Sequence, residues 1–250
     1  MHASARGTGD PSATTTHDIW KVSAMAAAQS FLPPTRGEVG LISAVLMTVV
    51  GGYVDAFLYL RHQVFGFAQT GNVVFLAVGL VKGDEWAKFA WPLLAYLAGL
   101  VAAQVLRTLV PTLPARALGS VLVFQLVVFT VLACLPSTAP AALFVIPLSF
   151  VGGVRLELFR TAGGISFVSI ATTGNLMRFI AAAADLARGR SSAQVRAAVA
   201  TAIVVLAFLV GALCGAGVAQ TIGPALWGAV LIEALGLAVF VAQVRTRPAA

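Results

Sequence analysis

Charge is scarce in this chain: 10% of its residues are charged, 59% are hydrophobic, and the mean hydropathy is +0.94. Soluble domains carry about 25% charged residues. A chain so poor in charge cannot cover the surface of a soluble protein, so we predict an integral membrane protein. The net charge is +7, but the basic residues gather in short connections between apolar segments. This distribution follows the positive-inside rule, and we expect no nucleic-acid partner.

Residue types that commonly carry catalysis or bind metals are also few. The histidines are His2, His17 and His62, and none lies deep in an apolar segment. Cys134 and Cys214 lie in apolar segments without disulfide or metal spacing. No His-Glu-x-x-His, Gly-x-Ser-x-Gly or phosphate-binding P-loop pattern is present. We therefore expect no catalytic residue, no metal, no cofactor and no enzymatic activity.

The first 38 residues differ in composition from the rest of the chain. They are rich in Ser, Thr, Gly, Pro and Ala and carry mixed charge, which predicts a disordered cytoplasmic tail over 1–38. Met25 is an alternative start to Met1. The remainder, 39–247, is expected to form a single transmembrane domain.

Eight apolar segments follow the tail, and each approaches the roughly 20 residues that a membrane span needs. Turn or charge signals separate them. The segments are 39–60, 64–81, 88–109, 118–135, 140–160, 164–184, 195–219 and 223–244.

The same polar tripeptide, Thr-Gly-Asn (TGN), interrupts two of these segments. Thr70-Gly71-Asn72 and Thr173-Gly174-Asn175 lie 103 residues apart (173 minus 70). A Gly-Asn pair at membrane depth breaks a helix and leaves backbone groups that lipid cannot satisfy. Two such breaks in corresponding places indicate a binding site between repeats.

Other matches in the same order support a duplication, with repeat one at 39–135 and repeat two at 140–245. Gly51-Gly52-Tyr53-Val54 aligns with Gly152-Gly153-Val154-Arg155, and Tyr96-Leu97-Ala98-Gly99 aligns with Phe208-Leu209-Val210-Gly211. The small residues at 99, 103, 211 and 215 suit close helix packing, which permits a homodimer without requiring one.

The loop charges favour six full spans plus two broken or re-entrant segments at the TGN turns. If neither TGN segment crosses, the uncharged 136–140 and 221–224 connections lie outside and most arginines lie in the cytoplasm. Each half then has three spans, so the repeats are inverted. A mixed arrangement, in which the first TGN segment crosses and the second does not, fits the charges almost as well and puts the N-terminus outside.

Each TGN turn is a candidate binding element. Thr70 or Asn72, and Thr173 or Asn175, could cap a half-helix whose free N–H groups favour an anion or a carbonyl oxygen. The Asn amide can both donate and accept, which suits a small polar or zwitterionic solute. The alternative is structural: these side chains tie the two breaks together.

Among the charged residues within the apolar segments, the strongest candidates are Asp55, Arg155, Glu157 and Glu233. Intramembrane charges are costly and are therefore candidates for function. Asp55 either binds a proton or cation, or forms an ion pair with Arg155 across the repeats. Glu233 is expected to face the protein interior, where the matching segment offers Gln125.

At these residues the chain resembles the YoaK-type family of bacterial inner-membrane proteins, a domain of unknown function. Gly52-Tyr53-Val54-Asp55-Ala56, Phe65 and the first TGN carry the family's pattern. In the second half, Gly153-Val154-Arg155-Leu156-Glu157 departs from the family's Gly-Met-Gln-Asn-Ala run. The resemblance covers roughly 38–245 and implies about six spans in the inner membrane, with no established substrate.

Three function classes remain from the sequence. The first is a small-solute secondary transporter or channel-like protein with its site at the paired TGN breaks and Asp55. The second is a non-transporting membrane scaffold or sensor, which predicts that Asp55 and both Asn residues are paired internally and that no cavity separates the repeats. A membrane-embedded enzyme acting on lipid ranks last.

Overall fold

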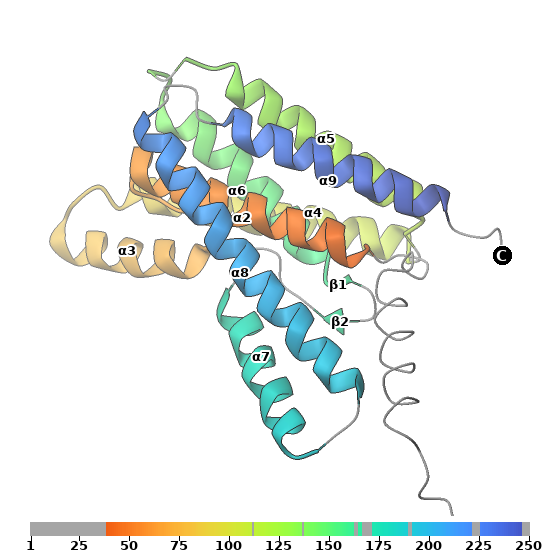
Figure 1. Cartoon of the computed structure of the whole chain (residues 1–250). Coiled ribbons are helices and arrows are strands. Elements are labelled where there is room, and N and C mark those ends of the chain that lie inside the picture. The colour runs from red at the N-terminus through yellow and green to blue at the C-terminus, as the bar shows by residue number, and fades with distance from the viewer. Residues whose placement is uncertain are drawn as a thin grey trace, which may run out of the picture.

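The computed structural model describes residues 39–246 apart from 112, 137, 163–164, 167–171, 190–191 and 222–225; the predicted tail lies outside the described residues. The described part is helical (Figure 1). Its helices are α2 (Leu41–His62), α3 (Gln69–Lys82), α4 (Ala87–Leu109), α5 (Ala115–Ala133), α6 (Ala141–Leu158), α7 (Thr172–Ala187), α8 (Ser192–Thr221) and α9 (Trp227–Arg245). Between α6 and α7, the two-residue strands β1 (Thr161–Ala162) and β2 (Ile165–Ser166) pair antiparallel.

Six of the helices are long and apolar enough to cross a membrane: α2, α4, α5, α6, α8 and α9. The protein is therefore a multi-pass membrane protein, as the hydropathy predicted. Helices α3 and α7 have 14 and 16 residues. At 1.5 Å per residue they reach about 21 and 24 Å, which is short of a hydrocarbon core of about 30 Å.

Helices α2 and α6 form the centre of the bundle. Of their membrane-length windows, 67% and 61% are buried, whereas the other four spans are 22–28% buried. Helix α8 packs along α2, and α4 packs along α6. Helices α5 and α9 lie side by side along one edge, while α3 and α7 lie at the opposite side of the bundle and pack on α4 and α8 (Figure 1).

Glycines set the close approach of the two central helix pairs. An added Cβ at Gly52 or Gly211 would collide with backbone across the α2–α8 contact, and one at Gly99 or Gly153 would do so across the α4–α6 contact. Backbones this close need residues without side chains, which is how helices gain packing energy in lipid. The packing role predicted for the small residues at 99 and 211 is confirmed.

The two broken segments differ from the expectation that each break divides one helix. Before the first TGN, residues 63–68 form an irregular loop. Its first residue, Gln63, has the left-handed backbone conformation at φ 58°. Helix α3 begins only at Gln69, so no half-helix precedes the turn. Before the second TGN lie the strand pair and residues outside the described part, and α7 begins at Thr172. The first break therefore lies at the start of a helix and does not divide one.

Candidate functional site

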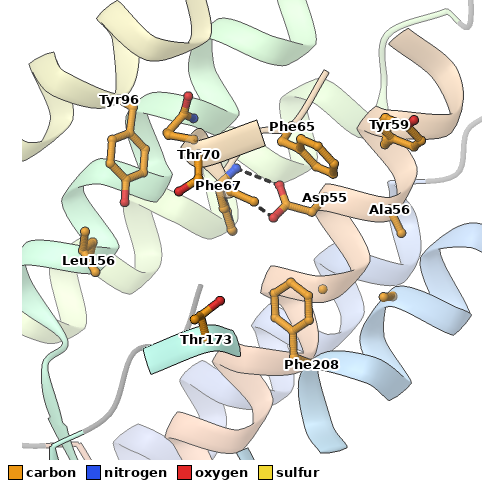
Figure 2. Close-up of a pocket in the computed structure, with 14 residues that line it drawn as sticks. Asp55, Ala56, Tyr59, Phe65, Phe67, Thr70, Tyr96, Leu156, Thr173 and Phe208 are labelled. Atoms are coloured by element: carbon orange, nitrogen blue, oxygen red, sulfur yellow. Dashed lines mark hydrogen bonds between the residues drawn. The ribbon is translucent and has the colours of Figure 1, made fainter. Parts of the chain in front are cut away.

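A cavity of about 440 Å³ lies where the two TGN turns meet (Figure 2). Its wall comes from both halves of the chain: α2, the 63–68 loop, α3 and α4 from the first half, and α6, α7 and α8 from the second. The lining residues are Gly52, Asp55, Ala56, Tyr59, Phe65, Phe67, Ala68, Gln69, Thr70, Tyr96, Leu156, Thr173, Phe208 and Ala212.

The threonines of the two turns line this one cavity. Thr70 lies in the first turn of α3 and Thr173 in the first turn of α7, and Figure 2 shows them facing the space from opposite sides. Both residues are exposed. Residues 103 positions apart in the sequence are thus brought to one site, which is the convergence that the paired tripeptides predicted.

Asp55 holds the loop that leads into α3. Its Oδ1 accepts the backbone N–H groups of Gly66 at 3.0 Å and Phe67 at 2.7 Å, and its Oδ2 accepts that of Ala68 at 3.1 Å. The side chain is 3% exposed. A buried carboxylate is stabilised by such charge-assisted bonds, and the loop gains an acceptor for N–H groups that no helix or sheet serves.

Asn72 closes the same loop from the helix side. Its Oδ1 accepts the Phe65 N–H at 3.0 Å, and its Nδ2 donates to the Phe65 carbonyl at 2.7 Å and to Gln69 Oε1 at 2.9 Å. The side chain is fully buried. Gly71 lies beneath the Phe65 ring, where a Cβ would come within 2.6 Å of it. Gly71 and Asn72 therefore shape the turn, and Thr70 is the TGN residue that faces the cavity.

The prediction that Thr70 or Asn72 caps α3 is wrong. The N-cap residue is Ala68, and no side chain caps that end from within the helix. The carboxylate of Asp55, from the preceding span, accepts the N–H groups just before the helix instead. The sequence pattern did not reveal this arrangement, because the 63–68 loop reaches Asp55 only when the chain turns back after the end of α2.

In the second turn, Thr173 lines the cavity and Asn175 is 2% exposed, which matches the burial of Asn72. Gly174 lies beside the guanidinium of Arg178, whose Nη1 would be 3.3 Å from a Cβ at position 174. The cavity therefore takes the same kind of residue from each turn.

The sequence matches the model of a protein family over residues 43–241, a range that includes both turns, the cavity-lining residues, four spans in full and most of α2 and α9. The chain belongs to the family described as Protein of unknown function (DUF1275). The resemblance read from the first TGN half is thereby confirmed. No match is found among curated proteins or among solved structures.

The 153–157 run, which the sequence analysis singled out for its two charges, contributes one residue to a buried ion pair. Arg155 is fully buried, and its Nη2 lies 2.6 Å from Glu233 Oε2. It also donates to Gln125 Oε1 from Nη2 at 2.7 Å and from Nε at 3.1 Å, and to the Met47 carbonyl at 3.0 Å. Helices α2, α5, α6 and α9 are joined through this one guanidinium.

The predicted Asp55–Arg155 pair is not formed. Asp55 is held by the backbone of the 63–68 loop, and Glu233 is the carboxylate at Arg155. Glu157, which shares a helix with Arg155, accepts bonds from Arg160 and lies 3.6 Å from Arg107 Nη1. Residues two positions apart on a helix face different directions. The two charges therefore have separate partners, Arg155 in the core and Glu157 at the end of α6.

Sequence reasoning missed the aromatic wall of the cavity. Tyr59, Phe65, Phe67, Tyr96 and Phe208 all line it. Two of them carried a signal, because Tyr96 and Phe208 head the aligned Tyr-Leu-Ala-Gly and Phe-Leu-Val-Gly runs. Apolar residues in an apolar chain do not otherwise stand out. Among the described residues, no group of three or more His, Cys, Asp or Glu side chains could hold a metal ion.

Proposed function

We propose that this protein is a secondary transporter of small solutes and that the cavity between the two TGN turns is its binding site. The observation that carries the proposal is the convergence of Thr70 and Thr173 on one cavity. In transporters built from repeats, the solute site lies where interrupted helices from the two repeats meet. We propose the bacterial inner membrane as its location, as the resemblance described above implies.

Reciprocal packing of the two halves supports the duplication on which this proposal rests. Gly52 of α2 packs against the Phe208 carbonyl of α8, and the aligned Gly153 of α6 packs against the Tyr96 carbonyl of α4. Phe208 and Tyr96 are aligned with each other as well. The first span of each half thus packs against the second span of the other half, as expected of two repeats around a two-fold axis.

A second set of contacts repeats the pattern. Gly99 of α4 packs against the Phe150 carbonyl, and the aligned Gly211 of α8 packs against the Val49 carbonyl. With three spans in each half, such repeats are inverted. In this arrangement α3 enters the membrane from one side and returns to it, and α7 does the same from the other side. Each has its TGN turn directed at the cavity.

The transport step we propose is a rocking of the α2–α8 pair against the α4–α6 pair. Each pair is held rigid by glycine contacts, and the cavity lies between them, lined by Asp55 and Phe208 on one side and by Tyr96 and Leu156 on the other. Aromatic rings and two threonine hydroxyls suit a small solute with an apolar body and a polar group.

A membrane scaffold or sensor remains the second candidate, and one observation favours it. Asp55 and Asn72 are both engaged in bonds to the 63–68 loop, as a structural role predicts. The cavity opposes it, since a scaffold has no need of a space between its halves. Neither the transporter nor the scaffold involves a catalytic step.

A thermal-shift screen of the detergent-purified protein against a broad solute library tests the proposal. A solute at 100 times its dissociation constant stabilises the native state by about 2.7 kcal/mol, which raises the melting temperature by roughly 5–10 °C. We expect one solute class to produce such a shift in the wild type and a much smaller one in Thr70→Val and Thr173→Val. Valine keeps the shape of threonine and removes the hydroxyl.

Thr108→Val is the matched control, because Thr108 donates to the Gln104 carbonyl within α4 and does not line the cavity. It should respond to solute as the wild type does. A screen in which no solute class separates the cavity variants from this control would remove the transporter proposal and leave the scaffold.

A further inference from the structure

Among the described residues that line the cavity there is no cation, and Asp55 is the one charged side chain. That carboxylate already accepts three backbone N–H groups. An anionic solute group would therefore find no counter-charge among these lining residues. A candidate lies one side chain deeper.

Arg155 lies directly behind the wall of the cavity. Its guanidinium carbon is 5.8 Å from the centre of the Phe67 ring, and Phe67 lines the cavity. Leu156, the next residue along α6, lines the cavity as well. A single aromatic ring thus separates the space between the two halves from a fully buried arginine.

Phe67 occupies this position under two constraints. Its N–H is bound by Asp55 at 2.7 Å, and its ring lies over Gly152, where a Cβ would come within 2.6 Å of it. The constraints act on the backbone and on one face of the ring. No hydrogen bond holds a phenyl ring, so a rotation about its side-chain torsions can open the wall while the loop stays fixed.

Two of the side chains that bind Arg155 each have a polar atom without a hydrogen-bond partner. The Nε2 of Gln125 and the Oε1 of Glu233 have no hydrogen-bond partner, although the two side chains are 0% and 3% exposed. An unsatisfied donor at full burial is costly. The Gln125 amide next to the guanidinium offers an incoming anion several N–H groups.

We propose that Arg155 and Gln125 form an anion subsite behind Phe67, and that the solute carries a carboxylate, sulfonate or phosphate group that reaches it when the ring turns aside. Glu233 is the resident anion with which that group competes for Arg155. The inference rests on the proposed transport function and supplies the charge class of its solute.

Cysteine modification tests the subsite without a known substrate. In a Cys134→Ser, Cys214→Ser background, Phe67→Cys puts a thiol at the wall, and Thr70→Cys puts one on the same cavity in a different part of its lining. Each is treated with an anionic sulfonatoethyl methanethiosulfonate and with its cationic trimethylammonioethyl counterpart. The anionic-to-cationic rate ratio at 70 corrects for the intrinsic reactivity of the reagents.

We expect the ratio to be about tenfold higher at position 67 than at 70, because the unpaired Gln125 amide and the adjacent guanidinium can donate a charge-assisted hydrogen bond to the anionic reagent and none to the cationic one. The preference should be lost with Arg155→Gln, kept with Arg155→Lys and increased with Glu233→Gln. Equal ratios at the two positions, or a cationic preference set by Asp55, would overturn the subsite. An unreactive Thr70→Cys would overturn the cavity and the transport proposal with it.

A second measurement keeps Phe67 in place. At matched ionic strength, methanesulfonate should raise the melting temperature of the wild type more than a trimethylammonium salt does. Gln125→Glu puts an internal carboxylate at the subsite, so that response should disappear. A methanesulfonate response equal to that of the cation in the wild type, or unchanged in Gln125→Glu, would contradict the proposal.

Discussion

At the scale of single residues, Asp55 illustrates how a buried charge in lipid is used. The cost of burial marks it as a functional candidate. Its three bonds to the N–H groups of Gly66, Phe67 and Ala68 assign it first to the loop that forms one wall of the cavity. At the aligned position in the second half the chain has Leu156, so only the first half carries this built-in anion.

Asp55→Asn separates a loop-holding role from an ion-coupling role. The amide keeps one acceptor oxygen and replaces the other with a donor that cannot accept an N–H. We expect the free energy of unfolding to fall by about 2–3 kcal/mol, which is the cost of leaving a buried N–H unpaired. Denaturant titration in detergent measures it.

Asp84→Asn is the control for this prediction, because Asp84 is exposed and accepts only the adjacent Glu85 N–H. It should stay within about 0.5 kcal/mol of the wild type. If Asp55→Asn unfolds like the wild type yet loses the solute-induced thermal shift, Asp55 acts on the solute or its coupling ion, as the sequence alone suggested.

At the scale of elements, the two glycine-packed pairs determine where the cavity can form. The α2–α8 and α4–α6 contacts bring backbones together, and the remaining space between the pairs is left to side chains. Helices that touch through glycines move as one body, because any sliding would bring side chains against backbone. The rigid units of the protein are therefore pairs that cross between the halves.

Gly211→Ala tests the rigidity of the α2–α8 pair. An ideal Cβ there would lie 2.7 Å from the Val49 carbonyl carbon and 2.9 Å from its Cα. Neither backbone atom can move without shifting a span, so we expect a loss of about 2–3 kcal/mol in the free energy of unfolding. Gly217→Ala on the same helix is the matched control, since a Cβ there meets nothing within 4 Å.

The control should be neutral or more stable by up to about 1 kcal/mol, because alanine has the higher helix propensity. Equal stability of the two variants would show that α2 and α8 are not held by this contact. Thermal unfolding monitored by circular dichroism distinguishes the two outcomes.

At the scale of the whole molecule, the topology depends on whether α3 crosses the membrane. Its 14 residues fall short of the membrane thickness, and both of its ends are joined to spans, α2 before it and α4 after it. If α3 does not cross, the connections on its two sides lie on one face of the membrane. If it crosses, as in the mixed arrangement, they lie on opposite faces.

Arg61→Cys and Asp84→Cys, both at exposed positions, report these two connections. In the cysteine-free background, a membrane-impermeant maleimide applied to intact cells should label both, and it should leave Thr246→Cys unlabelled until the cells are opened. Labelling of only one of the first two positions would show that α3 crosses and would rule out the inverted-repeat arrangement.

The sequence by itself determined the membrane class, the six spans, the family and the two turns whose threonines line the cavity. These follow from hydropathy and from local punctuation, which add up along the chain without reference to fold. It also identified Asp55, Arg155 and Glu233 as costly charges, because the burial of an ionised group is unfavourable wherever it lies.

Only the tertiary structure decided which groups meet. Arg155 pairs with Glu233 and Gln125 rather than with Asp55, and Asp55 serves a loop 11 to 13 residues away. The cavity and its aromatic wall depend on how α2–α8 and α4–α6 cross, and glycine contacts between distant segments fix that crossing. Such choices depend on distances in space, which a pattern along one chain does not contain.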